Sequence, residues 1–556
     1  MKSSDELKNA LLKMDKKSYK LYKSLEGMWN FRDFILCIDH VQADPFATPS
    51  RVRLIIDNKN NFPDSYFENK VRKIALEDFL LRRLHKFLKE NSTSRRGSGK
   101  SGLVGACPVK QEVLERIAVI INKKQIEARL EVGFPAFGRS IAAKEFEPVL
   151  FNLFPKLEKE VFLYENTPKD KLEESIFLAD DQNYIREELE KRNLLAFVAD
   201  GSILPRESGV SNKPMKNAIP FKSPKSLEVT LNLPHMGQLT GMGIKPGITT
   251  IAGGGYHGKS TLLKALESGI YNHIKGDGRE YVITRKNAVK LRAEEGRPVN
   301  KVDISMFINN LPFDTDTSNF STQNASGSTS QAANTVEAAA CGSDLFLIDE
   351  DTSATNFMVR DSIMASLVPK ENEPITPFLS CMRSLYEDLG ISSILVIGSC
   401  GSYLPLSDTV IQMDNYKAID LTKKAMEISK EINNLIENKK VSLGNIFKNS
   451  VTRKHIEKAK VHDIHTLSLD KNDIDLRSIE QICDSGQTAA LAYIMQYALS
   501  KVADGKKNPL QIAKEVMEII ENKGFSAVVP KNYPAGSPVM VRLIEIVECL
   551  SRYRAN

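Results

Sequence analysis

A short glycine-rich stretch constrains the fold of this chain more than any other feature. The stretch at 251–264 reads Ile-Ala-Gly-Gly-Gly-Tyr-His-Gly-Lys-Ser-Thr-Leu-Leu-Lys and contains the phosphate-binding pattern G-x-x-x-x-G-K-[ST]. A β-branched run precedes it at 247–252, and residues that favour helices follow at 260–267. A strand that leads through such a loop into a helix is typical of an α/β fold with a parallel sheet. The residues that match the pattern are Gly253, Gly258, Lys259 and Ser260.

The residue types of this loop suit ATP with Mg²⁺. Glycines allow backbone N–H groups to turn toward an anion, and the following helix adds its positive end. Lys259 is predicted to reach the β- and γ-phosphates, and the Ser260 hydroxyl to bind Mg²⁺. His257 either contacts a phosphate or faces solvent. The predicted nucleotide-binding residues of the loop are Gly253, Gly254, Gly255, Tyr256, His257, Gly258, Lys259, Ser260 and Thr261.

A second glycine-rich stretch, Gly97-Ser-Gly-Lys-Ser101, resembles the first but lacks two of its features. Ser94 occupies the position of the first glycine, and a polar run at 91–96 stands where the apolar strand would be. Polar residues of this kind are typical of loops. We therefore expect a basic, glycine-rich loop here and no second nucleotide site.

The composition is that of a globular protein with several domains. A length of 556 residues suggests three or four domains, and 42% hydrophobic with 26% charged residues is an ordinary balance. No apolar run approaches the length of a membrane span, and the N-terminus lacks an apolar signal segment. The seven cysteines are scattered, so reduced thiols in a cytoplasmic protein are expected. The net charge of +6 allows a nucleic-acid partner without requiring one.

The pattern of apolar residues divides the chain into three expected domains. An α+β domain at 1–205 comes first. The second domain, at 206–420, opens with a polar linker at 206–226 and then repeats strand, loop and helix, which predicts a parallel sheet. The third, at 421–556, is mainly helical, with an apolar helix at 489–499. In the first domain, helices are predicted at 7–25, 70–89 and 170–197, and strands at 31–41, 52–56, 116–122 and 125–134. In the second, strands are predicted around Ile251 and at 281–284, 345–348, 394–397 and 410–412.

Two acidic residues end an apolar strand of the second domain. The run Leu345-Phe-Leu-Ile-Asp-Glu350 would hold the Asp349 carboxylate beside the phosphate-binding loop, where it is predicted to bind Mg²⁺. Glu350 follows directly and is predicted to polarise the attacking water. An apolar run that ends in Asp-Glu is also common where a strand reaches the surface. The phosphate-binding loop in the same region favours the catalytic interpretation, with Glu350 and Lys259 as catalytic residues.

A segment between these two elements resembles the signature motif of ABC-type ATPases. It reads Asn324-Ala-Ser-Gly-Ser-Thr-Ser-Gln331, with Ser326 and Gly327 as the Ser-Gly pair and Ser328 in place of the second glycine. An alanine-rich helix follows, as a helix with a phosphate at its N-terminus can be. The alternative is a polar loop without a ligand. By this resemblance, Ser326, Gly327 and Ser328 are predicted to bind the nucleotide.

Longer strings over nearly the whole chain are similar to the family of predicted ATPases of the ABC class. They include Phe307-Ile-Asn-Asn-Leu-Pro312, Ile348-Asp-Glu-Asp-Thr-Ser-Ala-Thr-Asn-Phe-Met358 and Ile38-Asp-His-Val-Gln42. The second string contains a segment that resembles a D-loop, with Asn356 in place of its aspartate. The resemblance implies ATP hydrolysis at a composite site, formed by the phosphate-binding loop of one nucleotide domain and the signature motif of another. One copy of each motif in the chain favours a homodimer, or pairing with a different ABC protein.

Two catalytic positions of ABC ATPases have no evident counterpart in the sequence. After the strand at 394–397, the switch histidine is replaced by Gly398-Ser-Cys-Gly-Ser402, in which Ser399 is the candidate substitute. A Q-loop glutamine is not evident, and Asp303 and Asn309 are the candidates for its place. The resemblance therefore implies slow hydrolysis.

A basic segment in the first domain suggests a nucleic-acid partner. Seven basic residues between 82 and 100 accompany one acid, Glu90, and such a segment can follow a phosphate backbone. The alternative is a solvated basic face. Since the resemblance favours RNA, the leading hypothesis is an RNA- or DNA-binding ATPase without a membrane partner; a nucleotide-gated scaffold and a small-molecule P-loop kinase are the alternatives. The seven residues are Arg82, Arg83, Lys86, Lys89, Arg95, Arg96 and Lys100.

Overall fold

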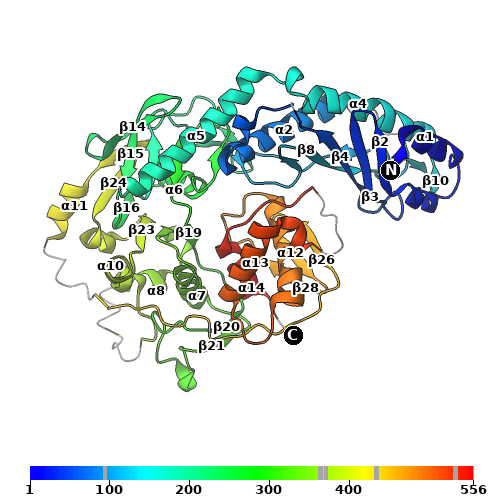
Figure 1. The fold of residues 1–556 in the computed structure, drawn as a ribbon. Helices are drawn as coiled ribbons and strands as arrows, with labels where there is room; N and C mark the ends of the chain where they lie inside the picture. Colours follow the sequence, from blue (N-terminus) through cyan, green and yellow to red (C-terminus); the bar gives the residue numbers. More distant parts are fainter. Residues whose placement is uncertain are drawn as a thin grey trace. The chain divides into compact units, whose positions relative to one another are not determined.

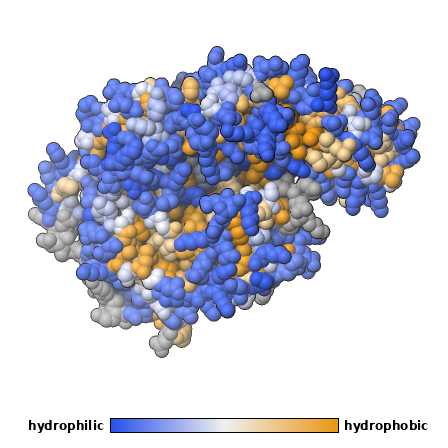
Figure 2. All heavy atoms as spheres, viewed as in Figure 1, coloured by the Kyte–Doolittle hydropathy of each residue, from blue (hydrophilic) through white to orange (hydrophobic). Residues whose placement is uncertain are grey.

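The computed structural model describes residues 1–59, 61–91, 97–360, 367, 373–430, 438–529 and 536–554. The chain forms two compact units, one of Met1–Asp180 with Ile520–Met540 and one of Asp181–Ile519 with Val541–Asn556. Figure 1 shows helices and strands mixed along the chain, and Figure 2 shows mainly hydrophilic side chains on the drawn face, with apolar patches between them. Within the described residues, no helix has the length and apolar character needed to cross a membrane.

The first unit is built on a mainly antiparallel sheet with the strand order β1-β2-β3-β4-β8-β5, and β7 also pairs with β8. The two edge strands, β1 (Lys2–Ser3) and β5 (Val104–Gly105), are short. Side chains alternate along β4 between buried and half-buried, so one face of the sheet packs into the core. The helix α2 (Lys70–Glu90) packs against β7 and buries Leu76, Leu80 and Leu84. The longer strands are β2 (Gly27–Phe31), β3 (Phe34–His40), β4 (Ser50–Asp57), β7 (Val119–Ile121) and β8 (Gln125–Val132).

Two N-terminal predictions differ from the structure. The helix predicted at 7–25 is divided into α1 (Ser4–Lys13) and the 3-10 helix η1 (Tyr19–Leu25), because the backbone of Lys16 turns to a φ of 63° between them. The strand predicted at 31–41 begins with the hairpin turn between β2 and β3. Both errors come from turns inside apolar patterns, where no glycine or proline marks the break.

The second unit contains the predicted parallel sheet, with the strand order β19-β22-β23-β16-β24-β25; of these strands, β25 runs antiparallel to its neighbour. Ile251, Leu347 and Ile394 of the central strands share one buried cluster with Leu262 and Leu266 of α6 (Lys259–Ser268). The sheet confirms the α/β class. Its strands are β16 (Ile248–Ala252), β19 (Ala288–Leu291), β22 (Leu345–Asp349), β23 (Ser392–Val396), β24 (Thr409–Asp414) and β25 (Lys417–Asp420).

A second sheet of this unit is antiparallel, with the order β14-β15-β11-β18. β11 (Ala196–Ala199) lies at the end of the helix predicted at 170–197, which stops instead with α5 (Lys169–Lys191). The strand predicted at 281–284 was expected in the parallel sheet. The structure instead has it as β18 (Val282–Thr284), which pairs with β11 in the antiparallel sheet. Short apolar runs do not reveal their pairing partner, so the sequence could not separate the two sheets. The remaining strands are β14 (Glu228–Leu233) and β15 (Gly237–Ile244).

The C-terminal region combines helices with a small antiparallel sheet, drawn in orange and red in Figure 1. The helix α12 (Ser485–Tyr497) covers most of the apolar helix predicted at 489–499. The sheet has the order β26-β27-β28. The other elements are β26 (Ala459–Asp463), β27 (Thr466–Leu469), β28 (Asn472–Asp475), α13 (Pro509–Lys523) and α14 (Leu543–Arg552).

The compact units divide the chain differently from the three predicted domains. Val198 of β11 precedes the predicted border at 205 but is buried in the cluster that holds Ile251. Phe221, inside the segment predicted as a linker, is buried in the same cluster. The three domains at 1–205, 206–420 and 421–556 remain a prediction.

Candidate nucleotide-binding site

Backbone geometry requires glycine at two of the predicted positions in the loop between β16 and α6. Gly253 has a φ of 143°, and a Cβ atom there would lie 2.4 Å from the Met413 carbonyl oxygen. Gly258 has a φ of 97°, and a Cβ atom there would lie 2.7 Å from the Tyr416 ring. Glycine therefore lets the loop close against β24 and the turn that follows it. The loop then enters the N-terminus of α6, an arrangement that suits a phosphate group.

Lys259 and His257 have partners that define their roles in the loop. The Lys259 Nζ atom donates to the Gly253 and Gly254 carbonyl oxygens at 2.7 Å each, so its charge lies over the loop. The His257 Nδ1 atom accepts a hydrogen bond from the Asn415 N–H at 2.9 Å, which ties the loop to the turn between β24 and β25. Tyr256 is fully exposed, with a φ of 64°. These contacts tie His257 to the turn after β24, and its contact with a phosphate remains a prediction.

The two predicted acids lie at the same edge of the parallel sheet as the glycine-rich loop. β23 separates β22 from β16, and all three strands are parallel, so their carboxyl ends share one edge. Asp349 ends β22 and is 8% exposed. The Glu350 carboxylate accepts hydrogen bonds from the Gly398 N–H at 2.6 Å, the Ser399 N–H at 3.3 Å and the Ser399 hydroxyl at 3.2 Å. Ser399, the candidate substitute for the switch histidine, therefore contacts Glu350 directly.

The oxygen donors at this edge fit Mg²⁺. Asp349 offers a carboxylate, and Ser260 offers a hydroxyl in the first turn of α6. Mg²⁺ is commonly bound through one or two protein oxygens and completes its shell with water and phosphate oxygens. Among the residues that the structure describes, no group of three or more His, Cys, Asp or Glu side chains could hold a metal ion by itself. A site completed by the nucleotide agrees with both observations.

The predicted signature residues form the N-terminus of α7 (Gly327–Ala340). Ser326 is the N-cap, and its hydroxyl accepts a hydrogen bond from the Thr329 N–H at 3.4 Å. The hydroxyls of Ser326 and Ser328 lie 3.2 Å apart. The Gln331 amide donates to the Ser353 hydroxyl at 3.1 Å, which joins α7 to the segment that resembles a D-loop. The structure thus places Ser326, Gly327 and Ser328 at a helix end that can accept an anion.

Sequence reasoning missed the loop that follows β19. β19 pairs in parallel with β22, so this loop also leaves the carboxyl edge of the sheet. Its Ala293 N–H donates to the Thr352 carbonyl oxygen at 3.0 Å, two residues after Glu350. The two residues named as candidates for the Q-loop glutamine both contact Ser305. Asp303 accepts a hydrogen bond from the Ser305 hydroxyl at 2.6 Å, and Asn309 donates to the Ser305 carbonyl oxygen at 2.7 Å. The strand before the missed loop, Ala288–Leu291, has only four residues, too few for a periodic pattern to reveal it.

Two arginines of the basic segment bind the protein itself. Arg82 pairs with Asp78 at 2.6 Å and donates to the Lys110 carbonyl oxygen at 2.6 Å. Arg83 donates to the Val161 carbonyl oxygen at 2.8 Å and the Thr167 hydroxyl at 2.6 Å, and its burial lowers its pKa. These contacts argue against the prediction that Arg82 and Arg83 bind nucleic-acid phosphates.

The other five basic residues differ in what the structure says of them. Lys86 and Lys100 are exposed, and the Lys86 ammonium lies 3.8 Å from Glu90. Lys89 has an interaction partner within the protein. Arg95 and Arg96 lie outside the described residues. The nucleic-acid interpretation therefore depends on fewer residues than the sequence suggests.

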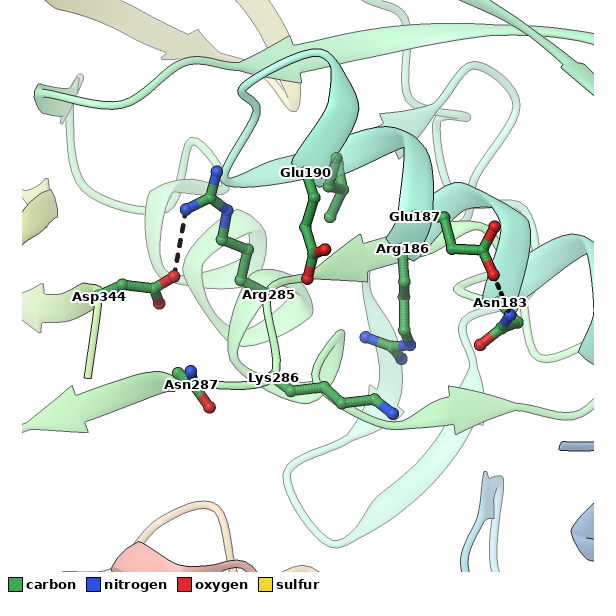
Figure 3. A pocket seen from close by; sticks show the side chains of 9 residues that line it. Asn183, Arg186, Glu187, Glu190, Arg285, Lys286, Asn287 and Asp344 are labelled. Carbon is green, nitrogen blue, oxygen red and sulfur yellow. Dashed lines mark hydrogen bonds and ion pairs between the residues drawn. The ribbon is translucent and has the colours of Figure 1, made fainter. Parts of the chain in front are cut away.

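A hollow of about 560 Å³ lies at the opposite edge of the parallel sheet (Figure 3). Its wall includes Asp344, directly before β22, and α5 forms another side. The charges are mixed, since Arg285 pairs with Asp344 at 3.1 Å and Asn183 donates to Glu187 at 2.9 Å. The hollow is thus separate from the predicted nucleotide site.

Family profiles match most of the chain. A profile described as the P-loop domain of ABC_ATPase matches residues 168–448, and one described as the N-terminal part of the ATPase of the ABC class matches residues 4–165. Residues 458–556 match the profile of the MRB1590 C-terminal domain.

Two individual proteins are also similar. The uncharacterized protein MJ1628 of Methanocaldococcus jannaschii is 32% identical over 254 residues, or 44% of this chain; the match spans about half, 55%, of that relative's length. The solved structure of cbiO1 from Clostridium perfringens, described as part of the ABC transporter complex cbiONQ, is 15% identical with a TM-score of 0.26 and covers 43% of this chain and 93% of cbiO1. On the extent of the P-loop and N-terminal profiles, the chain belongs to the family of ABC-class ATPases.

Proposed function

We propose that the chain binds ATP with Mg²⁺ at the Gly253–Ser260 loop and hydrolyses it slowly, with Glu350 as the base that polarises water. The observation that carries the proposal is the placement of the Glu350 carboxylate at the loop edge of the sheet, held there by Gly398 and Ser399. A catalytic base must be held within reach of the water that it activates. Three donors from one loop supply that support.

The other residues have roles that follow from their positions. Lys259 would exchange its two carbonyl partners for phosphate oxygens, and the N–H groups at the start of α6 would add donors. Ser260 and Asp349 would hold Mg²⁺, which neutralises charge on the phosphates when it is bound. The neutral Ser399 hydroxyl offers less electrostatic stabilisation than a protonatable ring, which supports slow turnover. The same argument supports the second candidate, a nucleotide-gated scaffold that hydrolyses little ATP.

We also propose that the active form is a two-fold homodimer. Each chain has one phosphate-binding loop and one signature turn, and the family resemblance pairs these across two nucleotide domains. A symmetric dimer completes two sites with one kind of contact. Seven free cysteines fit a reducing, cytoplasmic environment.

Substitution of Glu350 tests the catalytic assignment. Glu350→Gln keeps the shape of the side chain but removes the base, so turnover is expected to fall by roughly 100-fold or more while ATP stays bound. Asp351→Asn, on the next residue, is the matched control and should keep turnover within about twofold. ATP hydrolysis and retained nucleotide are measured on the same preparations. Equal rates for wild type and Glu350→Gln would leave the scaffold as the better function.

Coupling to nucleic acid, with RNA before DNA, remains a proposal from the family resemblance. Lys86 and Lys100, two exposed residues of the basic segment, support it. The measurement is ATP turnover with and without single-stranded RNA at two salt concentrations, for wild type and Lys86→Glu/Lys100→Glu. Stimulation that the double variant and high salt both reduce supports the proposal. The absence of any RNA effect on the wild type contradicts it.

A further inference from the structure

The C-terminal helix α14 is bonded to the loop that follows β19. The Arg552 guanidinium forms a two-point contact with Glu294, with Nε at 3.1 Å and Nη2 at 2.6 Å from the two carboxylate oxygens. The side chains of Arg552 and Glu294 are 3% and 12% exposed. Two residues later, Arg554 donates to the Gly296 carbonyl oxygen at 3.1 Å. The end of the chain that the structure describes thus holds this loop at two points.

The same loop supports the turn that carries the predicted signature residues. The Glu294 N–H donates to the Ser330 hydroxyl at 2.9 Å, and that hydroxyl donates to the Gly327 carbonyl oxygen at 2.8 Å. Ser330 is fully buried. Continuous hydrogen bonds therefore lead from Arg552 through Glu294 and Ser330 to Gly327.

A second set of contacts fixes the chain directly before the signature turn. The Gly296 N–H donates to the Ala325 carbonyl oxygen at 2.8 Å, and the Ala325 N–H donates to the Arg297 carbonyl oxygen at 2.9 Å. Arg297 is also paired with Glu337 of α7 at 2.5 Å, with both side chains almost completely buried. Arg552 reaches α7 itself, at 3.3 Å from the Asn334 amide oxygen. The loop after β19 is therefore fixed between α14 on one side and α7 on the other.

We infer that α14 positions the signature turn. Arg552 thereby determines how readily two chains dimerise in the presence of ATP, although it is not one of the predicted nucleotide-binding residues. The inference rests on the proposed composite site. A planar guanidinium that binds a carboxylate at two points fixes orientation as well as distance. Loss of the two-point contact leaves the buried Glu294 carboxylate without its guanidinium partner, and the loop is then free to shift. Arg552 is thus a positioning residue.

The test uses Arg552→Lys in the full chain with Glu350→Gln, because lysine keeps the charge but loses the two-point contact. The matched control is Arg477→Lys, which changes an exposed arginine paired with Asp475 at 2.5 Å in the same C-terminal region. Sedimentation velocity with Mg–ATP measures the protein concentration at which half of the chains are dimeric. That concentration is expected to rise roughly tenfold in Arg552→Lys and to stay unchanged in the control. ATP affinity of the monomer should change by less than about twofold, since the Gly253–Ser260 loop keeps its contacts.

Hydrogen exchange separates this inference from the proposed function. Amides at 327–331 should exchange roughly tenfold faster in Arg552→Lys, with the amides of α6 unchanged. If exchange at 327–331 is unchanged, or if all amides exchange faster together, the inference is wrong. If the Glu350→Gln parent does not dimerise with ATP, the composite site is wrong, and the exchange result still decides the role of Arg552. Glu294→Gln provides a second variant that should reproduce both effects, without adding to them in the double variant.

Discussion

Two loops of this chain end in the same three residues, Gly-Lys-Ser, yet they differ in what surrounds them. In the Gly97–Ser101 loop of the first unit, the N–H of Ser98 donates to Ala136 and that of Lys100 donates to Pro45, both at 2.8 Å. Its Ser101 is buried and donates to the Ser98 carbonyl oxygen at 2.6 Å. These donors are used within the protein. The Gly253–Ser260 loop instead joins a parallel strand to the N-terminus of a helix, at the sheet edge where Asp349 and Glu350 lie.

The comparison shows that the strand before and the helix after a Gly-Lys-Ser segment decide its chemistry. A glycine-rich loop that packs on other loops uses its flexibility to make close backbone contacts. A similar loop at the carboxyl edge of a parallel sheet can use that flexibility for an anion. The sharpest ways to break this comparison are paired substitutions that change the same residue type in both loops.

The lysine pair gives the largest expected difference. Lys259→Ala removes the charge that lies over the nucleotide loop, and ATP turnover is expected to fall by roughly 100-fold or more. Lys100→Ala should keep turnover within about twofold, because its loop has no predicted role in ATP binding. Steady-state hydrolysis at saturating Mg–ATP measures both. A comparable loss in the two variants would show that both loops serve the nucleotide.

The glycine pair should separate stability from binding. Gly99 has a φ of 60°, and a Cβ atom there would lie 2.4 Å from the Pro45 carbonyl oxygen. Gly99→Ala is therefore expected to lower the free energy of unfolding of the first unit by about 3 kcal/mol. ATP affinity should be unchanged. Gly253→Ala should weaken ATP affinity, since the loop must shift from Met413. Urea denaturation and nucleotide titration measure the two effects, and the opposite assignment would contradict the account.

The smallest effect is expected at Ser399, which contacts the Glu350 carboxylate. Ser399→Ala removes one of the three hydrogen bonds to Glu350, and kcat is expected to fall by up to about tenfold with KM for ATP unchanged. Ser399→Thr keeps the hydroxyl and should restore most of the rate. An unchanged kcat in Ser399→Ala would show that the backbone donors of Gly398 and Ser399 are sufficient.

Local patterns predicted the strands and the helix that carry the central part of the candidate site. The strand, loop and helix at 248–268 and the strand that ends at Asp349 were predictable. Each combines an apolar run with functional residues at its end: the glycine-rich loop in the first case and the two acids in the second. The roles of Arg82 and Arg83 were not predictable, since their carbonyl partners lie far away in the sequence. The loop after β19 was not predicted as part of the site for a similar reason. Its position beside Thr352 depends on the parallel pairing of β19 with β22, which no local pattern reveals.

The composite site is the central claim, and mixing two inactive variants tests it most directly. Lys259→Ala damages the phosphate-binding loop, and Gly327→Asp places a carboxylate at the helix end that should face the phosphate, where a Cβ atom has room. Each variant alone should hydrolyse almost no ATP. In an equal mixture, half of the dimers should be mixed and each of those should hold one intact site, so about a quarter of the wild-type rate is expected. A mixture no more active than its components would contradict the composite site.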